Sequence, residues 1–147
     1  MQAVVVLLLD ATRGLEVQDL ICLHSQIYSR GLLGFDDFTE AERAKWSPVR
    51  QRLVRRHPRT GRLSLYLSSH AGAIEGWPIP EARAFLRDLN EHATQRRFVY
   101  AHVWQPWDLV MWDNRVTMHR ARPFRSSEAR DMRRTTLTNE VSSLEQA

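Results

Sequence analysis

The residues with the clearest chemical potential lie near the C-terminus, between Trp112 and Arg134. A short β-like run ends there in His119, and arginines follow at Arg130, Arg133 and Arg134. A histidine on a rigid strand is a common metal ligand, and the planar guanidinium of arginine matches the two oxygens of a carboxylate. The spacing allows a loop and a return strand to bring the arginines beside the histidine. The alternative is an exposed histidine followed by a solvated basic strand, and the residue types alone leave both open.

The full wording of this stretch, WDNRVTMHRARPFRSSEARDMRR, resembles the C-terminal signature of the TauD/TfdA family of Fe(II)- and 2-oxoglutarate-dependent dioxygenases. The resemblance implies that His119 is the last of three iron ligands. It also implies that Arg130 pairs with the far carboxylate of 2-oxoglutarate and that Arg134 faces the acidic substrate. The implied activity is hydroxylation, with O2, of a small carboxylic acid such as 2,4-dichlorophenoxyacetate.

The likeness is not confined to that signature and extends over residues 10–139. The matching phrases include LHS at 23–25, QRLVR at 51–55, HP at 57–58, SLYLSSHAG at 64–72 and EHATQ at 91–95. It implies that His70, and less directly His57, line the substrate pocket, although each histidine fits an ordinary turn residue equally well. Residues 1–9 do not match the family, and residues 140–147 form a polar tail.

One departure from the family pattern concerns the metal. A non-haem Fe(II) site of this class needs two histidines and one carboxylate. The family supplies the first histidine and the acid as an upstream H-x-D motif, but none of the six histidines here is followed two places later by Asp or Glu. The family's upstream threonine for 2-oxoglutarate is also absent. We therefore expect a truncated member that is inactive alone, and the rival hypothesis is an enzyme that takes its other ligands from a separate chain. The sequence leaves open whether the short start is biological or a gene-calling artefact.

The composition indicates one ordinary globular domain. The 147 residues are 43% hydrophobic and 26% charged, and Cys22 is the only cysteine, so an internal disulfide is excluded. The apolar run at residues 3–9 is too short to span a membrane and lacks the flanks of a signal peptide. We expect a cytoplasmic protein without membrane contact, and a homo-oligomer remains open.

The net charge of +4 comes almost wholly from arginine, because Lys45 is the only lysine. Six of the arginines lie between residues 50 and 62, and such a basic ribbon could track phosphates. The rival function is therefore an arginine-rich module that binds anions or nucleic acid. Aromatic residues are not interleaved for base stacking, however, and no nucleic-acid-binding motif is present. We do not expect nucleic-acid binding.

The pattern of elements predicts a mainly β chain with inserted helices, of the α+β class. Together with the resemblance it suggests a partial double-stranded β-helix, or jelly roll, whose N-terminal half is missing. Apolar periodicity, capping signals and turn residues predict helices at 15–28, 39–46 and 81–93, a hairpin over 49–67 that turns at 58–61, and further strands at 1–9, 98–104, 109–112 and 133–138.

Overall fold

The computed structural model of the chain describes residues 2–6, 17–127, 129–137 and 142–145. The strands are β1 (Gln2–Val6), β2 (Ile21–His24), β3 (Val49–Arg52), β4 (Val54–Arg56), β5 (Leu63–Leu65), β6 (Ala71–Ile74), β7 (Val99–His102) and β8 (Thr117–Ala121). The helices are α2 (Gln26–Gly31), α3 (Glu40–Lys45), α4 (Ile79–Ala93) and the short 3-10 helix η1 (Arg96–Phe98). The prediction of many short strands with a few helices is confirmed.

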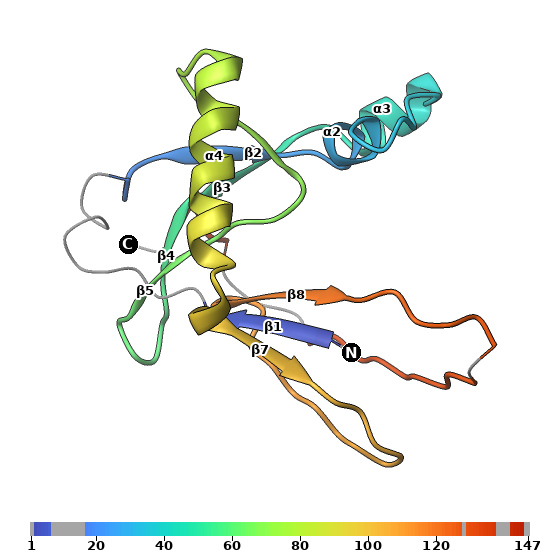
Figure 1. The fold of residues 1–147 in the computed structure, drawn as a ribbon. Helices are drawn as coiled ribbons and strands as arrows, with labels where there is room; N and C mark the ends of the chain where they lie inside the picture. Colours follow the sequence, from blue (N-terminus) through green and yellow to red (C-terminus); the bar gives the residue numbers. More distant parts are fainter. Residues whose placement is uncertain (1, 7–16, 128, 138–141, 146–147) are drawn as a thin grey trace.

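The strands form three small antiparallel sheets. Their orders are β7-β1-β8, β3-β2-β6 and β4-β5. Figure 1 shows the first sheet below the other two, with β8 running along its upper side. β1, from the part of the chain that the family pattern does not match, lies between β7 and β8 and pairs Val4 with His119. The strand that carries the candidate metal ligand is therefore held by the N-terminal segment.

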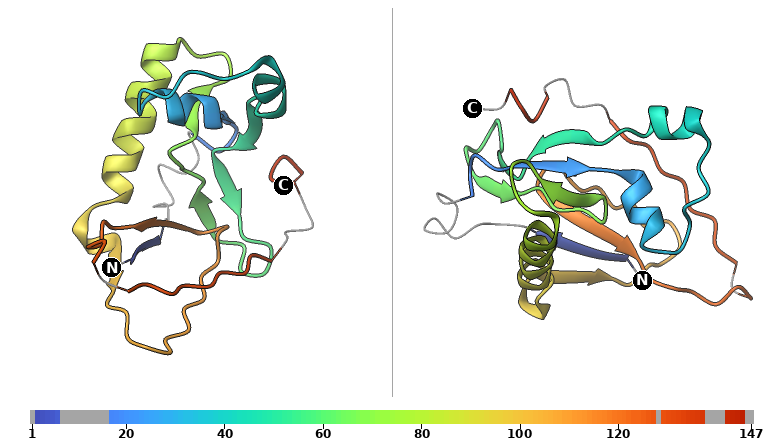
Figure 2. Two further views of the ribbon diagram at one scale, coloured as in Figure 1. Left: turned by 90° about the vertical axis from the view of Figure 1, so that its right-hand side faces the viewer. Right: turned by 90° about the horizontal axis from the view of Figure 1, so that it is seen from above.

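The core lies where α4 packs against β6 and the neighbouring strands (Figures 1 and 2). Helix α4 begins after Pro78, as expected for proline near a helix start, and buries Ala82, Leu86 and Ala93. The strands and the residues next to them contribute further buried side chains: Cys22, Leu53, Val54, Leu65, Leu67, Ala71 and Ile74. Met118 of β8 packs against this cluster, so the core supports the strand of His119.

Several predicted elements are confirmed at nearly the predicted positions. Thr39 and Glu42 form a complete capping box at the start of α3. Of the hairpin predicted over 49–67, the part formed by β4 and β5 is confirmed, with Leu65 and the following Leu67 buried; residues 49–52 instead form β3, which pairs with β2. Of the strand predicted over residues 1–9, the part that the structure describes is confirmed as β1; residues 1 and 7–9, and the burial of the β1 side chains, lie outside the described residues.

The predicted helix over residues 15–28 is wrong. Residues 21–24 form the central strand β2, and Ser25 then caps α2 by accepting a hydrogen bond from the Tyr28 backbone N–H. The short apolar run fits a helix face and a buried strand alike, and only pairing with β3 and β6 decides between them. These partners lie about 30 and 50 positions along the chain, so local periodicity carries no sign of them.

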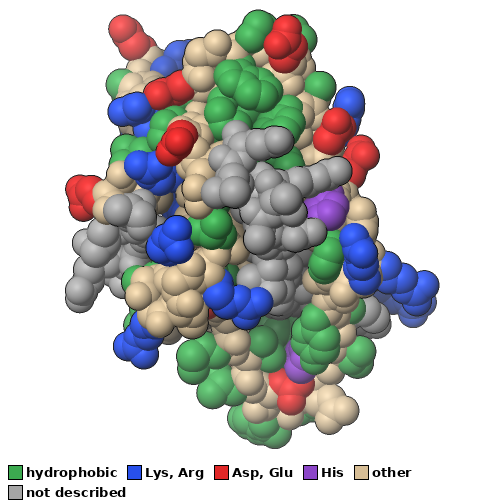
Figure 3. Space-filling model, turned by 90° about the vertical axis from the view of Figure 1, so that its left-hand side faces the viewer, with side chains coloured by type: hydrophobic (Ala, Val, Ile, Leu, Met, Phe, Trp, Pro, Cys, Tyr) green, Lys and Arg blue, Asp and Glu red, His purple; other side chains and the backbone are tan. Residues whose placement is uncertain are grey.

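Two predicted C-terminal strands are also wrong. Residues 109–112 and 133–137 have no strand pairing in the described structure, and residue 138 of the second prediction lies outside it. Leu109 and Met111 are about nine-tenths exposed, and Trp107 is fully exposed. Figure 3 shows hydrophobic side chains gathered at the lower end of the molecule, where the loop after β7 lies. An apolar run becomes a strand only where a neighbouring strand can pair with it.

Gly72 makes a close contact that a larger residue would break. A Cβ atom there would lie 2.6 Å from Cδ1 and Cγ of Tyr28. The Arg83 guanidinium also packs on the Tyr28 ring, 4.8 Å from the ring centroid, which limits how far the ring can move. Gly72→Ala is therefore expected to lower the free energy of unfolding by about 1–3 kcal/mol in urea denaturation. Gly31→Ala is the matched control, because nothing lies within 4 Å of a Cβ there, and an equal loss in both variants would contradict the prediction.

Candidate functional site

The turn that leads into β8 aims the His119 side chain. The centroids of the Trp112 and His119 rings lie 4.9 Å apart, and the ring planes are tilted by 48° to one another. The Trp112 indole N–H donates to Oδ1 of Asn114 at 2.8 Å, which fixes the orientation of the indole. Thr117 begins β8, and residues two apart on a strand share a face. Trp112 therefore contacts the candidate metal ligand directly, and Asn114 acts on it through the indole.

His119 is exposed on one side and lies in the electrostatic field of Arg134. Partial desolvation lowers the pKa of His119, and the positive charge of Arg134 lowers it further. Both effects favour the neutral imidazole, which is the form that coordinates a metal. Of the three C-terminal residues that the resemblance singles out, Arg134 is therefore near enough to His119 for its charge to act on the imidazole.

The remaining arginines of this segment are placed differently. Arg130 stacks on the Phe124 ring, with its guanidinium carbon 4.7 Å from the centroid. Arg133 is almost fully exposed and approaches only Asp131, at 4.0 Å. Arg130 has no carboxylate within salt-bridge distance among the described residues, so its guanidinium can receive an anion. Among the described residues, Arg133 has no hydrogen bond or stacking contact that would position it, which makes it a useful control residue.

The described residues do not form a complete iron site. Within residues 2–6, 17–127, 129–137 and 142–145, no group of three or more His, Cys, Asp or Glu side chains could hold a metal ion. His119 has an aromatic ring and an arginine beside it, and neither can serve as an iron ligand. A lone imidazole does not satisfy the two-histidine, one-carboxylate set that non-haem Fe(II) requires. The residues present therefore do not fit the metal by themselves.

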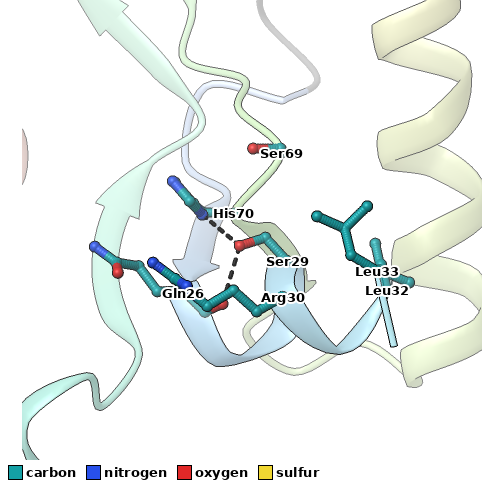
Figure 4. Close-up of a pocket in the computed structure, with 7 residues that line it drawn as sticks. All are labelled: Gln26, Ser29, Arg30, Leu32, Leu33, Ser69 and His70. Atoms are coloured by element: carbon teal, nitrogen blue, oxygen red, sulfur yellow. Dashed lines mark hydrogen bonds between the residues drawn. The ribbon is translucent and has the colours of Figure 1, made fainter. Parts of the chain in front are cut away.

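His70 lies at a pocket between α2 and the loop after β5 (Figure 4). The pocket has a volume of about 560 Å³ and is lined by Gln26, Ser29, Arg30, Leu32, Leu33, Ser69 and His70. Ser29 donates its hydroxyl to the Gln26 carbonyl at 3.0 Å and lies 2.7 Å from Nδ1 of His70. The hydroxyl therefore accepts from His70, which leaves Nε2 without a partner in this contact. Sequence reasoning found His70 but missed Ser29 and Arg30, because nothing local marks their meeting with a residue 40 positions away.

His57 lies apart from that pocket, at the contact between the β4–β5 turn and the turn before β8. Its Nδ1 accepts from the Thr60 backbone N–H at 3.2 Å, and its Nε2 lies 3.3 Å from Oδ2 of Asp113. Both ring nitrogens are thus occupied within the chain. A substrate contact by His57 would have to replace one of these two hydrogen bonds.

The arginines of the basic hairpin are largely engaged within the protein. Arg50 forms a two-pronged ion pair with Glu75, and Arg52 approaches Asp19 at 3.7 Å. The guanidinium carbon of Arg55 lies 3.3 Å from the centroid of the Tyr66 ring. Arg55 is half-buried, and this burial lowers the pKa of its guanidinium. Arg56 donates to the Gly61 carbonyl. These contacts leave little of the ribbon available for phosphates.

Along the described chain, no helix combines the length and apolar character needed to cross a membrane.

Known proteins resemble this chain over most of its length. The model of the family described as taurine catabolism dioxygenase TauD, TfdA family matches residues 15–136. The α-ketoglutarate-dependent 2,4-dichlorophenoxyacetate dioxygenase of Cupriavidus pinatubonensis is 46% identical over 126 residues, which are 86% of this chain and 44% of that protein. The (S)-phenoxypropionate/α-ketoglutarate-dioxygenase of Sphingobium herbicidovorans is 38% identical over 132 residues, covering 84% of this chain and 45% of that protein.

Solved structures give the same result. AAD-2 in complex with Mn(II) and N-oxalylglycine superposes with a TM-score of 0.84 at 53% identity, over 90% of this chain and 54% of that one. A taurine dioxygenase from Burkholderia xenovorans gives a TM-score of 0.61 at 30% identity, over 80% and 39%. This chain therefore spans about half the length of the proteins it matches. The family match over residues 15–136, together with these likenesses, shows that the chain belongs to the TauD/TfdA family of dioxygenases.

Proposed function

We propose that this chain forms part of an Fe(II)- and 2-oxoglutarate-dependent dioxygenase that hydroxylates a small carboxylic acid of the aryloxyacetate type, such as 2,4-dichlorophenoxyacetate. The observation that carries the proposal is that the positive charge of Arg134 reaches the partly desolvated imidazole of His119, on the strand that follows the WDNR turn. The names of the relatives at 46% and 38% identity support this class of substrate. The oxidising chemistry belongs to iron, 2-oxoglutarate and O2.

Three residues of the C-terminal signature, His119, Arg130 and Arg134, have a role in this proposal. His119 provides one imidazole to the iron, and Arg130 binds the far carboxylate of 2-oxoglutarate. Arg134 binds the carboxylate of the substrate, for which its planar fork is well suited. We assign a substrate contact to His70, which borders a pocket, and not to His57, whose ring nitrogens are both occupied.

The proposal requires iron ligands from outside the described residues. The chain's own histidines lack an H-x-D arrangement, and no described carboxylate accompanies His119. The other ligands come from a further segment of the same protein or from a second chain, and they complete a double-stranded β-helix with the present sheets. The polypeptide of 147 residues is then not expected to hold iron tightly by itself.

Anaerobic titration with Fe(II) and 2-oxoglutarate tests the proposal. We expect no tight ternary complex with this chain alone, because one imidazole cannot retain Fe(II) in water. A complemented enzyme is made by adding the part of the C. pinatubonensis relative that lies outside its match to this chain. The complemented enzyme is expected to form the complex and to release succinate when 2,4-dichlorophenoxyacetate is added.

Two results would contradict this assignment. Tight ternary binding by the chain alone would show that its ligand set is complete. Unchanged binding by a complemented His119→Ala variant would show that His119 is not a ligand. The rival function, binding of nucleic acid, predicts a sub-micromolar duplex DNA complex at moderate salt. We expect only weak binding, because most hairpin arginines are engaged within the chain.

A further inference from the structure

Two turns that are far apart in the sequence meet at His57. One is the β4–β5 turn that contains Thr60, and the other is the turn at Asp113 that precedes β8. A backbone N–H can only donate, so Nδ1 of His57 must accept from Thr60, at 3.2 Å. The hydrogen of the neutral ring then lies on Nε2 and points toward Oδ2 of Asp113, at 3.3 Å. The His57 side chain is 12% exposed, so water competes poorly for these bonds.

Asp113 joins the His57 contact to the backbone of the turn. Its carboxylate accepts from the Arg115 guanidinium at 2.6 and 2.8 Å and from the Arg115 backbone N–H at 2.9 Å. These hydrogen bonds from Arg115 hold the pKa of Asp113 far below its usual range, so the carboxylate is ionised and remains an acceptor. The Ser64 hydroxyl of β5 donates to the Arg115 carbonyl at 3.2 Å. The β4–β5 hairpin is therefore hydrogen-bonded to the turn before β8 at two points, His57 to Asp113 and Ser64 to Arg115.

The same turn fixes the first residue of β8. The Asp113 carbonyl accepts from the Thr117 backbone N–H at 3.1 Å and from the Thr117 hydroxyl at 2.7 Å. His119 follows two residues later on the same face of the strand. A continuous set of hydrogen bonds thus runs from the His57 ring, through Asp113, to the strand position that sets where the His119 imidazole points.

We propose that His57 is a positioning residue, whose Nε2–H holds the Asp113 turn and thereby fixes the direction of His119 from β8. The functional importance of this role rests on the proposed function of His119 as an iron ligand. Partners of this kind commonly influence metal affinity without touching the metal. The proposal differs from a substrate contact, because it requires both ring nitrogens of His57 to remain bonded within the chain. It also gives a reason for the aspartate and the arginine of the WDNR motif.

The chain contains a matched control for this arrangement. His102, at the end of β7, also has an aspartate partner, with its Nε2 2.9 Å from Oδ2 of Asp108. That pair is 19% and 32% exposed, similar to the 12% and 33% of His57 and Asp113. Its hydrogen bonds among the described residues go to Tyr100 and Gln105 and not to the turn before β8. His102→Gln removes the same chemistry while leaving the path to His119 intact.

NMR of the chain as it stands tests the positioning role without any metal. Long-range ¹⁵N spectra of the wild type should show His57 as the Nε2–H tautomer. In His57→Gln and His57→Ala, amide hydrogen exchange of Thr117 and His119 should rise at least tenfold more than exchange of the α4 amides. The ring resonances of His119 should shift in both variants. Asp113→Asn should give the same pattern, and His102→Gln should leave β8 and His119 as in the wild type.

The second measurement is the Fe(II) affinity of the complemented enzyme, which should fall about tenfold or more in His57→Gln. Unchanged β8 exchange in His57→Ala, or an Nδ1–H tautomer in the wild type, would overturn the positioning role whatever the metal does. Absence of metal binding by the wild-type complemented enzyme would refute the proposed function alone, because the NMR results would still decide how His57 acts on β8.

Discussion

Arg134→Gln is expected to raise the KM of the complemented enzyme for 2,4-dichlorophenoxyacetate by about 100-fold while leaving kcat within a few-fold. A charge-assisted hydrogen bond to a carboxylate contributes about 1.5–3 kcal/mol, which corresponds to roughly 10–100-fold in affinity. Glutamine keeps hydrogen-bond donors but removes the positive charge and the two-pronged fork. A contact made equally with the bound substrate and the transition state appears in KM and not in kcat.

The neighbouring arginine provides the control for this experiment. Arg133 is 92% exposed, and among the described residues its one ion-pair partner is Asp131, so Arg133→Gln removes the same charge from the same segment without removing the charge that acts on His119. Its KM should stay within about twofold of the wild type, since an exposed charge is largely screened. Equal effects of the two variants would show that only the overall charge of the segment matters, and would contradict a specific role for Arg134.

The elements that local sequence predicts correctly are those whose signals lie within a few residues. The Thr39–Glu42 capping box needs only four consecutive positions, and α4 shows both a proline at its start and a helical stripe. The hairpin combines alternating leucines with a turn at residues 58–61, and the WDNR turn precedes β8 directly. In each case the hydrogen-bond partners are close in the chain, so residue order carries the information.

The elements predicted wrongly depend on partners that are distant or not described. β2 exists because β3 and β6 pair with it, and no local feature of residues 21–24 announces them. Conversely, residues 109–112 have the composition of a buried strand but lie exposed, because no described strand pairs with them. Composition indicates what a segment can do in a sheet, whereas pairing decides what it does.

The candidate site also combines features that local sequence indicates with contacts that form only between distant residues. The WDNR wording led to His119, and the structure adds reasons for its individual letters: Trp112 packs on the His119 ring, and Asn114 holds the indole. The contact of Asp113 with His57 spans 56 positions, so no spacing rule could have predicted it. The sequence therefore predicts which residues could carry chemistry, whereas the residues that would position them are seen only in long-range contacts of the structure.

A second group of polar side chains, centred on His24, controls how stability depends on pH. The His24 ring stacks on the Tyr66 ring with 5.1 Å between the ring centroids, and Nδ1 of His24 lies 3.0 Å from the Ser68 hydroxyl oxygen. Its Nε2 is buried and has no hydrogen-bond partner among the described residues. Burial lowers the pKa of His24 to about 4, and the charge of Arg55 and the nearby His70 act in the same direction. The folded protein therefore keeps His24 neutral under mildly acidic conditions.

The sign of the pH effect follows from this shift. In the unfolded chain the pKa of His24 is 6.5, so between pH 6.5 and about 4 the unfolded state binds a proton that the folded state does not. The stability due to the neutral ring is complete above pH 6.5 and is lost as the pH falls toward 4. Because the ring is partly solvated, we expect a loss of about 2 kcal/mol between pH 7 and pH 4, somewhat less than the full shift implies.

Urea denaturation of the wild type and His24→Gln at several pH values between 4 and 7 measures this contribution. Glutamine does not titrate, so its unfolding free energy should fall less steeply with decreasing pH, by about 2 kcal/mol over the range. Acidic groups with lowered pKa values, such as Asp108, contribute equally to both proteins and cancel in the difference. His92→Gln is the control, because the His92 ring contacts Phe98 away from the His24 group, and its profile should run parallel to that of the wild type. A His24→Gln profile that is also parallel would show that the buried imidazole takes up its proton normally, and that the packing of Tyr66, Ser68 and Arg55 around it does not exclude charge.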